Sequence, residues 1–137
     1  MIIVAGLLVP ACAEAKGADK STGLEEPARL EATQGSDIER VILTAEAVER
    51  LDLQTAAVEA GASGNATTIP HAAVFYGLTG ETWTYSNPES LTYVRVPITV
   101  DRIQGEVAYL TDGPEPGTQV VTLGAPELFG VESGIGD

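Results

Sequence analysis

Apolar and polar residues alternate in short runs over residues 67–128, and turns rich in Gly and Pro separate these runs. Alternation with a period of two indicates β-strands with one face against a core, because successive side chains point to opposite faces of a sheet. The clearest run is 91–100, where positions 94, 96, 98 and 100 are Val, Val, Ile and Val. Pro97 has no backbone N–H, so this strand is expected at a sheet edge or beside a bulge. The expected strands are 67–76, 82–86, 91–100, 107–111 and 119–123.

The segment before these strands predicts one short helix. Residues 41–43 are apolar and predict a strand, and Thr44 is a suitable N-cap for the helix that follows. Glu46 stands in the first turn, where the helix dipole favours a negative charge. The chain then reads as extended over 53–58 and as a Gly/Ser/Ala loop over 59–66. Several short strands at this spacing favour a mainly β fold, a small antiparallel β-barrel or roll with one short helix.

The chain of 137 residues is long enough for one domain. Residues 12–40 are mostly small or polar and contain no aromatic side chain. Such a segment buries too little apolar surface to offset the entropy of ordering it. We therefore expect a disordered tether over 12–40, a β domain over 41–130 and a flexible tail over 131–137.

The first eleven residues, MIIVAGLLVPA, form an apolar run that ends directly before Cys12. A membrane span needs about 20 apolar residues, whereas about 7–15 are typical of the core of a signal peptide. The residues VPA before Cys12 resemble a bacterial lipobox, which implies cleavage of 1–11 and diacylglycerol on the Cys12 thiol. The protein is then expected in the cell envelope, outside the cytoplasm and anchored to the membrane by its lipid. No Lys or Arg precedes the apolar run, so an unlipidated secreted protein and a cytoplasmic protein stay open as alternatives.

Acidic residues dominate the charge of the chain. It has 20 Asp and Glu against 7 Lys and Arg, which gives a formal net charge of −13. An acidic surface repels a phosphate backbone, so we expect no nucleic-acid partner. The acidic residues are scattered along the sequence, which is typical of a solvated surface.

Residue types that carry catalysis or bind metals are sparse. Cys12 is the only cysteine and His71 the only histidine. A metal site needs three or four ligands, so we expect His71 to be a structural or surface residue. Asp101, Glu106 and Asp112 flank predicted turns, where carboxylates are common. These observations predict no enzymatic activity, no metal site and no cofactor.

Three aromatic residues lie on neighbouring predicted strands. Trp83 and Tyr85 share one face of the strand 82–86, and Tyr93 lies on the next strand. They are expected either to form a cross-strand cluster in the core or to present a patch to a partner. The second interpretation makes Trp83, Tyr85 and Tyr93 candidate partner-contact residues, beside Cys12 as the lipidation site.

Two segments resemble a known family. Residues 44–58 (TAEAVERLDLQTAAV) resemble an N-terminal segment of bacterial periplasmic adaptor subunits, the membrane fusion proteins of tripartite efflux pumps. Residues 69–74 (IPHAAV) and 83–85 (WTY) resemble the entry to the membrane-proximal domain of the same family. The resemblance continues to the end of the predicted domain, over 96–100, Gly105, 107–110, Gly113, Gly117, 120–121, 124–125 and Leu128.

The resemblance implies a fold and a function. Full adaptors hold a coiled-coil hairpin, a lipoyl-like domain and a β-barrel between those two segments, whereas this chain has only the loop 59–66. In that family both chain ends build the membrane-proximal domain, so a closed β domain is implied even without the middle. The implied function is that of a non-enzymatic envelope lipoprotein that docks to a membrane transporter or another envelope protein. The alternative is a free-standing extracytoplasmic module that binds a small ligand or a metal.

Overall fold

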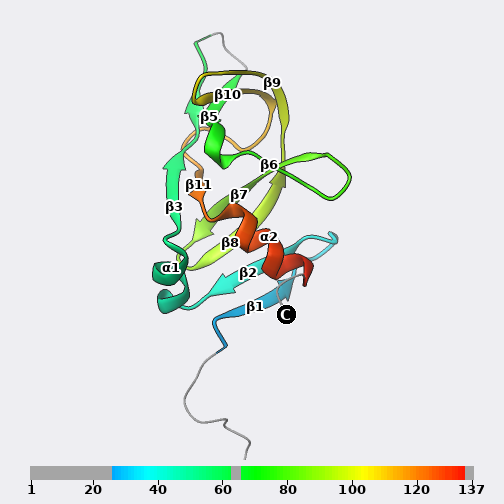
Figure 1. Ribbon diagram of the computed structural model, residues 1–137. Helices are drawn as coiled ribbons and strands as arrows, with labels where there is room; N and C mark the ends of the chain where they lie inside the picture. The colour runs from blue at the N-terminus through cyan, green and yellow to red at the C-terminus, as the bar shows by residue number, and fades with distance from the viewer. Residues whose placement is uncertain (1–25, 63–65, 135–137) are drawn as a thin grey trace, which may run out of the picture.

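A computed structural model describes residues 26–62 and 66–134 (Figure 1). The strands are β1 (Ala28–Ala32), β2 (Glu39–Leu43), β3 (Gln54–Ala57), β4 (Glu59–Ala60), β5 (Thr67–Pro70), β6 (Phe75–Tyr76), β7 (Thr82–Glu89), β8 (Thr92–Pro97), β9 (Thr99–Gln104), β10 (Val107–Asp112) and β11 (Gln119–Leu123). The helical elements are α1 (Ala45–Leu51), the 3-10 turn η1 (His71–Ala73) and α2 (Ala125–Ser133). No helix within these ranges has the length and apolar character needed to cross a membrane.

All strand pairs are antiparallel, which confirms the predicted mainly β, antiparallel class. The larger sheet has the order β1-β2-β8-β7-β11-β3, and β6 also pairs with β7. The second sheet has the order β4-β5-β10-β9. Both sheets stay open, so the architecture is two sheets rather than a closed barrel. Strands from before and after the β4–β5 hairpin share the larger sheet, so both halves of the chain build it.

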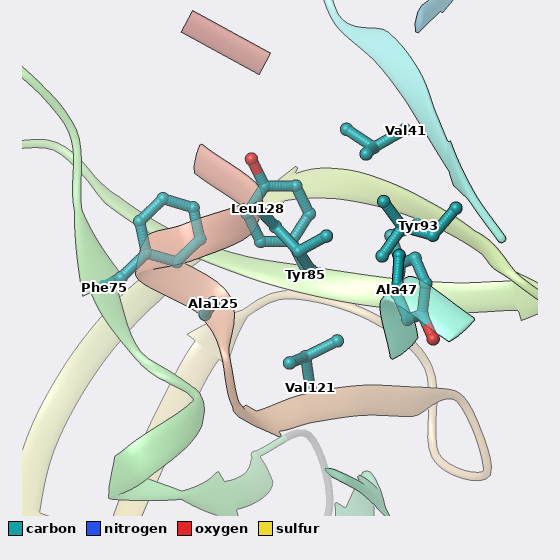
Figure 2. Close-up of a cluster of buried hydrophobic side chains, with 9 residues drawn as sticks. Val41, Ala47, Phe75, Tyr85, Tyr93, Val121, Ala125 and Leu128 are labelled. Carbon is teal, nitrogen blue, oxygen red and sulfur yellow. The ribbon is translucent and has the colours of Figure 1, made fainter. Parts of the chain in front are cut away.

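Two hydrophobic clusters lie on opposite faces of the larger sheet. Helices α1 and α2 cover the first cluster, which contains Val41, Leu43, Ala47, Phe75, Tyr85, Tyr93, Val121, Ala125 and Leu128 (Figure 2). The second cluster joins the sheets and contains Val58, Ile69, Ala73, Ile98, Ala108, Leu110 and Val120. Neighbouring residues of one strand enter different clusters, as Val120 and Val121 do, because their side chains point to opposite faces. Thr84 and Ser86 are buried for the same reason, so β7 is covered on both faces rather than half-buried.

Helix α1 forms as the sequence predicted, whereas α2 was missed. The Thr44 hydroxyl accepts a hydrogen bond from the Ala47 N–H at 3.1 Å and caps α1. The prediction of one short helix and a flexible tail from residue 131 is wrong, because α2 continues to Ser133. A proline in its first turn and Gly134 at its C-cap (φ +71°) are typical signals of the two ends of a helix.

The predicted tether extended too far toward the C-terminus. Residues 28–43 form the β1–β2 hairpin, in which five consecutive residues of each strand pair without a register shift. The folded part therefore begins before residue 41. Residues 12–25 of the predicted tether and the predicted signal peptide 1–11 lie outside the described residues.

The predicted strand 91–100 is two strands that belong to different sheets. Its alternation is continuous in sequence, but Pro97 ends β8 and Thr99 begins β9. Between them Ile98 is buried in the second cluster, and its N–H donates to the Thr82 carbonyl at 3.1 Å. Pro97 thus marks the passage between the sheets, where its missing N–H interrupts no ladder. The predicted strand 67–76 is likewise divided, because η1 separates β5 from β6.

Candidate functional site

The sequence-predicted aromatic residues form a core cluster. Tyr85 is 0% and Tyr93 is 4% exposed, and Trp83 is half-buried. The Tyr85 ring stacks on Phe75 with 5.0 Å between ring centroids and 8° between planes. The interpretation of these aromatic residues as a partner-contact patch is therefore wrong for Tyr85 and Tyr93, which a partner cannot reach in this fold. Cys12, the predicted lipidation site, lies outside the described residues.

Beneath α2 a polar network joins the helix to the larger sheet. Arg95 on β8 and Glu132 on α2 form an ion pair, with 3.3 Å between Nε and Oε1. The Tyr85 hydroxyl donates to the other carboxylate oxygen of Glu132 at 2.5 Å. The Arg95 guanidinium also lies 4.1 Å from the centre of the Trp83 ring, a cation–π geometry.

Burial governs the chemistry of this network. Burial of the Tyr85 hydroxyl and its hydrogen bond to Glu132 raise the pKa of Tyr85 far above its ordinary value of about 10. Tyr85 therefore stays protonated and acts as a hydrogen-bond donor at physiological pH. Arg95 and Tyr85 both contact the Glu132 carboxylate, so the network attaches α2 to the larger sheet and has a structural role.

The remaining sequence candidates lie apart from this network. The His71 side chain is exposed at the start of η1, and its backbone N–H donates to the Glu106 carbonyl at 2.7 Å. Asp101 pairs with its neighbour Arg102 at 3.0 Å. Within residues 26–62 and 66–134, no three His, Cys, Asp or Glu side chains gather as metal ligands would.

The loop between β6 and β7 projects from the sheet (Figure 1). Large apolar side chains on this loop and at the end of β6 are exposed. Tyr76 is 61% and Leu78 is 76% exposed, the two highest values among the large apolar residues of the described chain. The residues of this loop separate the predicted strands 67–76 and 82–86, and no functional role was predicted for them. The unused sequence signal is a leucine beside a turn glycine, where small polar residues are usual.

Hydrogen bonds hold the loop in one shape. The Gly77 N–H donates to the Glu81 carbonyl at 2.8 Å, and the Gly80 N–H donates to the Gly77 carbonyl at 3.2 Å. The Thr79 N–H donates to a Glu81 carboxylate oxygen at 3.1 Å, and the Thr79 hydroxyl donates to the same oxygen. These bonds, the one from the hydroxyl foremost, lower the pKa of Glu81. Gly80 has a φ of +89°, which favours glycine at this position.

In comparisons with known proteins, no protein-family model, no curated protein and no solved structure matches this chain. The candidate site is therefore defined by its own geometry. It consists of Tyr76 at the end of β6 and Leu78 on the β6–β7 loop, both exposed, and of the exposed Glu81 carboxylate, which accepts hydrogen bonds from Thr79. Such a site suits contact with an apolar surface of another molecule.

Proposed function

We propose that this chain is a non-enzymatic domain of the cell envelope that docks to a membrane transporter or another envelope protein. The observation that carries the proposal is the exposure of Tyr76, at the end of β6, and of Leu78, on the hydrogen-bonded β6–β7 loop. A few large side chains supply most of the binding energy of an interface. A loop that is already ordered loses little conformational entropy when it binds.

The adaptor-like part of the proposal rests on the resemblance of residues 44–58 and 69–74 to the membrane fusion proteins. Strand β3, within the first of these segments, pairs with β11 from the other half of the chain. This pairing is compatible with a domain assembled from both ends of a chain. The loop between the two halves is short, and the Gly61 N–H donates to the Ala66 carbonyl at 2.6 Å.

A lipid at Cys12 completes the proposal. Residue 26 follows Cys12 by 14 positions, and a chain of that length spans at most about 50 Å when fully extended. This reach allows the domain to contact the extracytoplasmic part of a transporter while its lipid stays in the bilayer.

The anchor is tested by expressing the full chain in a bacterium that processes lipoproteins, beside the Cys12→Ala variant. We expect membrane-bound protein whose intact mass corresponds to a start at an acylated Cys12, and loss of both properties in the variant. Soluble protein that retains residues 1–11 would remove the anchor from the proposal.

Docking is tested by placing a photo-crosslinking amino acid at position 78 in cells, with position 123 as the matched control. Leu123 is also exposed, at 46%, but lies at the end of β11. We expect adducts from position 78 that contain a transporter or another envelope protein, identified by mass spectrometry and by the reciprocal crosslink. Equal adducts from both positions, or none, would contradict docking through the loop.

A further inference from the structure

Among the described residues, strand β1 lies at one edge of the larger sheet with no strand on its outer side. Its charged side chains would face opposite charges if a second copy of the strand paired with it in the antiparallel direction. The strand reads Ala-Arg-Leu-Glu-Ala and is centred on Leu30. When a second copy runs antiparallel with Leu30 opposite Leu30, Arg29 of each copy lies opposite Glu31 of the other. We propose that two copies of this chain pair edge to edge along β1 in this two-fold arrangement. The resulting interface is isologous, as in most homodimers.

The backbone of β1 presents the groups that this register requires. Within the described ranges β1 pairs only with β2, and Ala28 lies opposite Leu43. The Leu43 N–H donates to the Leu91 carbonyl at 2.9 Å, so the backbone groups of Leu43 point away from β1. The backbone N–H and C=O of its partner Ala28 therefore point toward the open edge. Along an antiparallel strand the backbone N–H and C=O groups point alternately to one side and to the other, so those of Leu30 and Ala32 also point outward. A second β1 centred on Leu30 pairs with these same groups.

The side chains of β1 suit the same register. Between the two β1 strands, Arg29 of one copy and Glu31 of the other form a non-hydrogen-bonded pair. In such pairs the side chains of opposite strands approach most closely. They are 67% and 46% exposed and contact each other at 3.3 Å within one chain, so they lie on one face and are open to a partner. Leu30 is 40% exposed on the other face, where Leu30 of the second copy covers it. Opposite charges across strands stabilise the pair, and like charges destabilise it.

The other open edges suit pairing less well. The register of β9 shifts twice against β10, and that of β3 shifts once against β11. Such irregularities twist an edge away from a straight partner strand. Strand β4 has only two residues. By contrast, β1 is regular over five residues, and its charges repel strands that lack the matching charges, which selects a second copy as the occupant.

The test is sedimentation velocity over a concentration series, on the full chain with Cys12→Ala to prevent lipidation and intermolecular disulfides. We expect a weak, reversible dimer, because the net charge of −13 on each copy opposes association. Arg29→Glu and Glu31→Arg each make both ion pairs repulsive and raise the dimer Kd about tenfold. The two changes combined restore the original Kd.

The design separates pairing from a general charge effect. The single reversals shift the net charge in opposite directions, so net charge alone would weaken one dimer and strengthen the other. Glu115→Arg, at an exposed turn, repeats the charge change of Glu31→Arg away from the edge and is expected to leave the dimer intact. A monomer at every concentration, or a dimer indifferent to both reversals, would overturn the proposal.

A backbone variant gives independent evidence. Leu30→Pro removes the N–H that faces the open edge and leaves the hydrogen bonds to β2 in place, as proline at an edge strand allows. We expect loss of the dimer with an unchanged unfolding transition. If this variant fails to fold, the charge reversals and their combination still decide the matter, and a folded Leu30→Pro dimer would overturn the proposal.

Discussion

Arg95 on β8 and Glu132 on α2 form an ion pair whose side chains are only 17% and 6% exposed. The pair lies beneath the last helix, so it connects the C-terminal element to the centre of the larger sheet. Removing one partner leaves the other charge without compensation in a place that water reaches poorly.

Glu132→Gln is therefore expected to lower the free energy of unfolding by about 3 kcal/mol, measured by urea denaturation. The matched control is the apolar pair Arg95→Met with Glu132→Leu, which removes both charges and is expected to recover most of the loss. A Glu132→Gln variant as stable as the parent would show that the pair contributes nothing to holding α2.

Tyr85→Phe removes the hydroxyl that donates to Glu132 and keeps the ring stacked on Phe75. The expected loss is about 2 kcal/mol at neutral pH, as for a hydrogen bond to a charged group. Tyr85→Leu, which also loses the stacking, is expected to be less stable than Tyr85→Phe. Equal stability of Tyr85→Phe and the parent protein in urea would argue against the hydrogen bond.

The raised pKa of Tyr85 predicts a loss of stability in alkali. An unfolded tyrosine loses its proton near pH 10, whereas folded Tyr85 retains it, so above that pH the unfolded state binds fewer protons. The contribution of Tyr85 to stability is complete below about pH 10. Above that pH, the free energy of unfolding falls by about 1.4 kcal/mol per pH unit. In the Tyr85→Phe variant the free energy of unfolding is expected to fall less steeply with pH. Part of the fall that remains comes from Tyr93, because burial also raises the pKa of Tyr93. Identical slopes in denaturation at pH 9 to 11 would refute this assignment.

The braced β6–β7 loop predicts a local response to acid. Hydrogen bonds from Thr79 lower the pKa of Glu81 below its ordinary value of 4.5, so this bracing is complete above that pH and is lost as pH falls through the lowered pKa. In an NMR titration the Thr79 amide is expected to report that midpoint. Thr79→Val removes the hydroxyl donor and is expected to move the midpoint upward, and an unchanged midpoint would contradict the bracing.

Gly124 begins α2 with a φ of +98°, and a Cβ there would overlap Leu53 Cδ2. Gly124→Ala is expected to lower the free energy of unfolding by about 3 kcal/mol, from backbone strain together with the overlap. Gly117 has a similar φ of +92° with nothing within 4 Å of its Cβ position, so Gly117→Ala is the control and costs about 1 kcal/mol. Equal losses of urea stability in the two variants would show that Leu53 moves aside freely.

Local sequence signals predicted most strands and α1, because alternation and an N-cap act over a few residues. Val94, Val96 and Val100 continue one alternation, yet β8 and β9 belong to different sheets. Periodicity reports which residues share a face and carries no information on which sheet that face belongs to. The scarcity of large apolar residues over 12–40 made β1 read as part of a tether, although its pairing with β2 orders it.

The candidate site was less accessible to sequence reasoning. Trp83, Tyr85 and Tyr93 stood out because aromatic residues are common both in cores and at interfaces. Tyr85 belongs to the core because Phe75 and the residues of α2, a helix that was not predicted, pack against it. Tyr76 and Leu78 are functional candidates through their exposure, and exposure is set by the fold rather than by local pattern.

The short β4–β5 hairpin has a consequence for how the domain tolerates added sequence. Its ends are fixed side by side by the pairing of Glu59 with Thr68 and by the bond from Gly61 to Ala66. The entropy of closing a loop grows slowly, by about 0.6 kcal/mol for each doubling of its length. A whole folded module mounted between Gly61 and Ala66 would therefore leave the strand order of both sheets unchanged. The β4–β5 hairpin is thus a position at which we expect the domain to tolerate a long insertion.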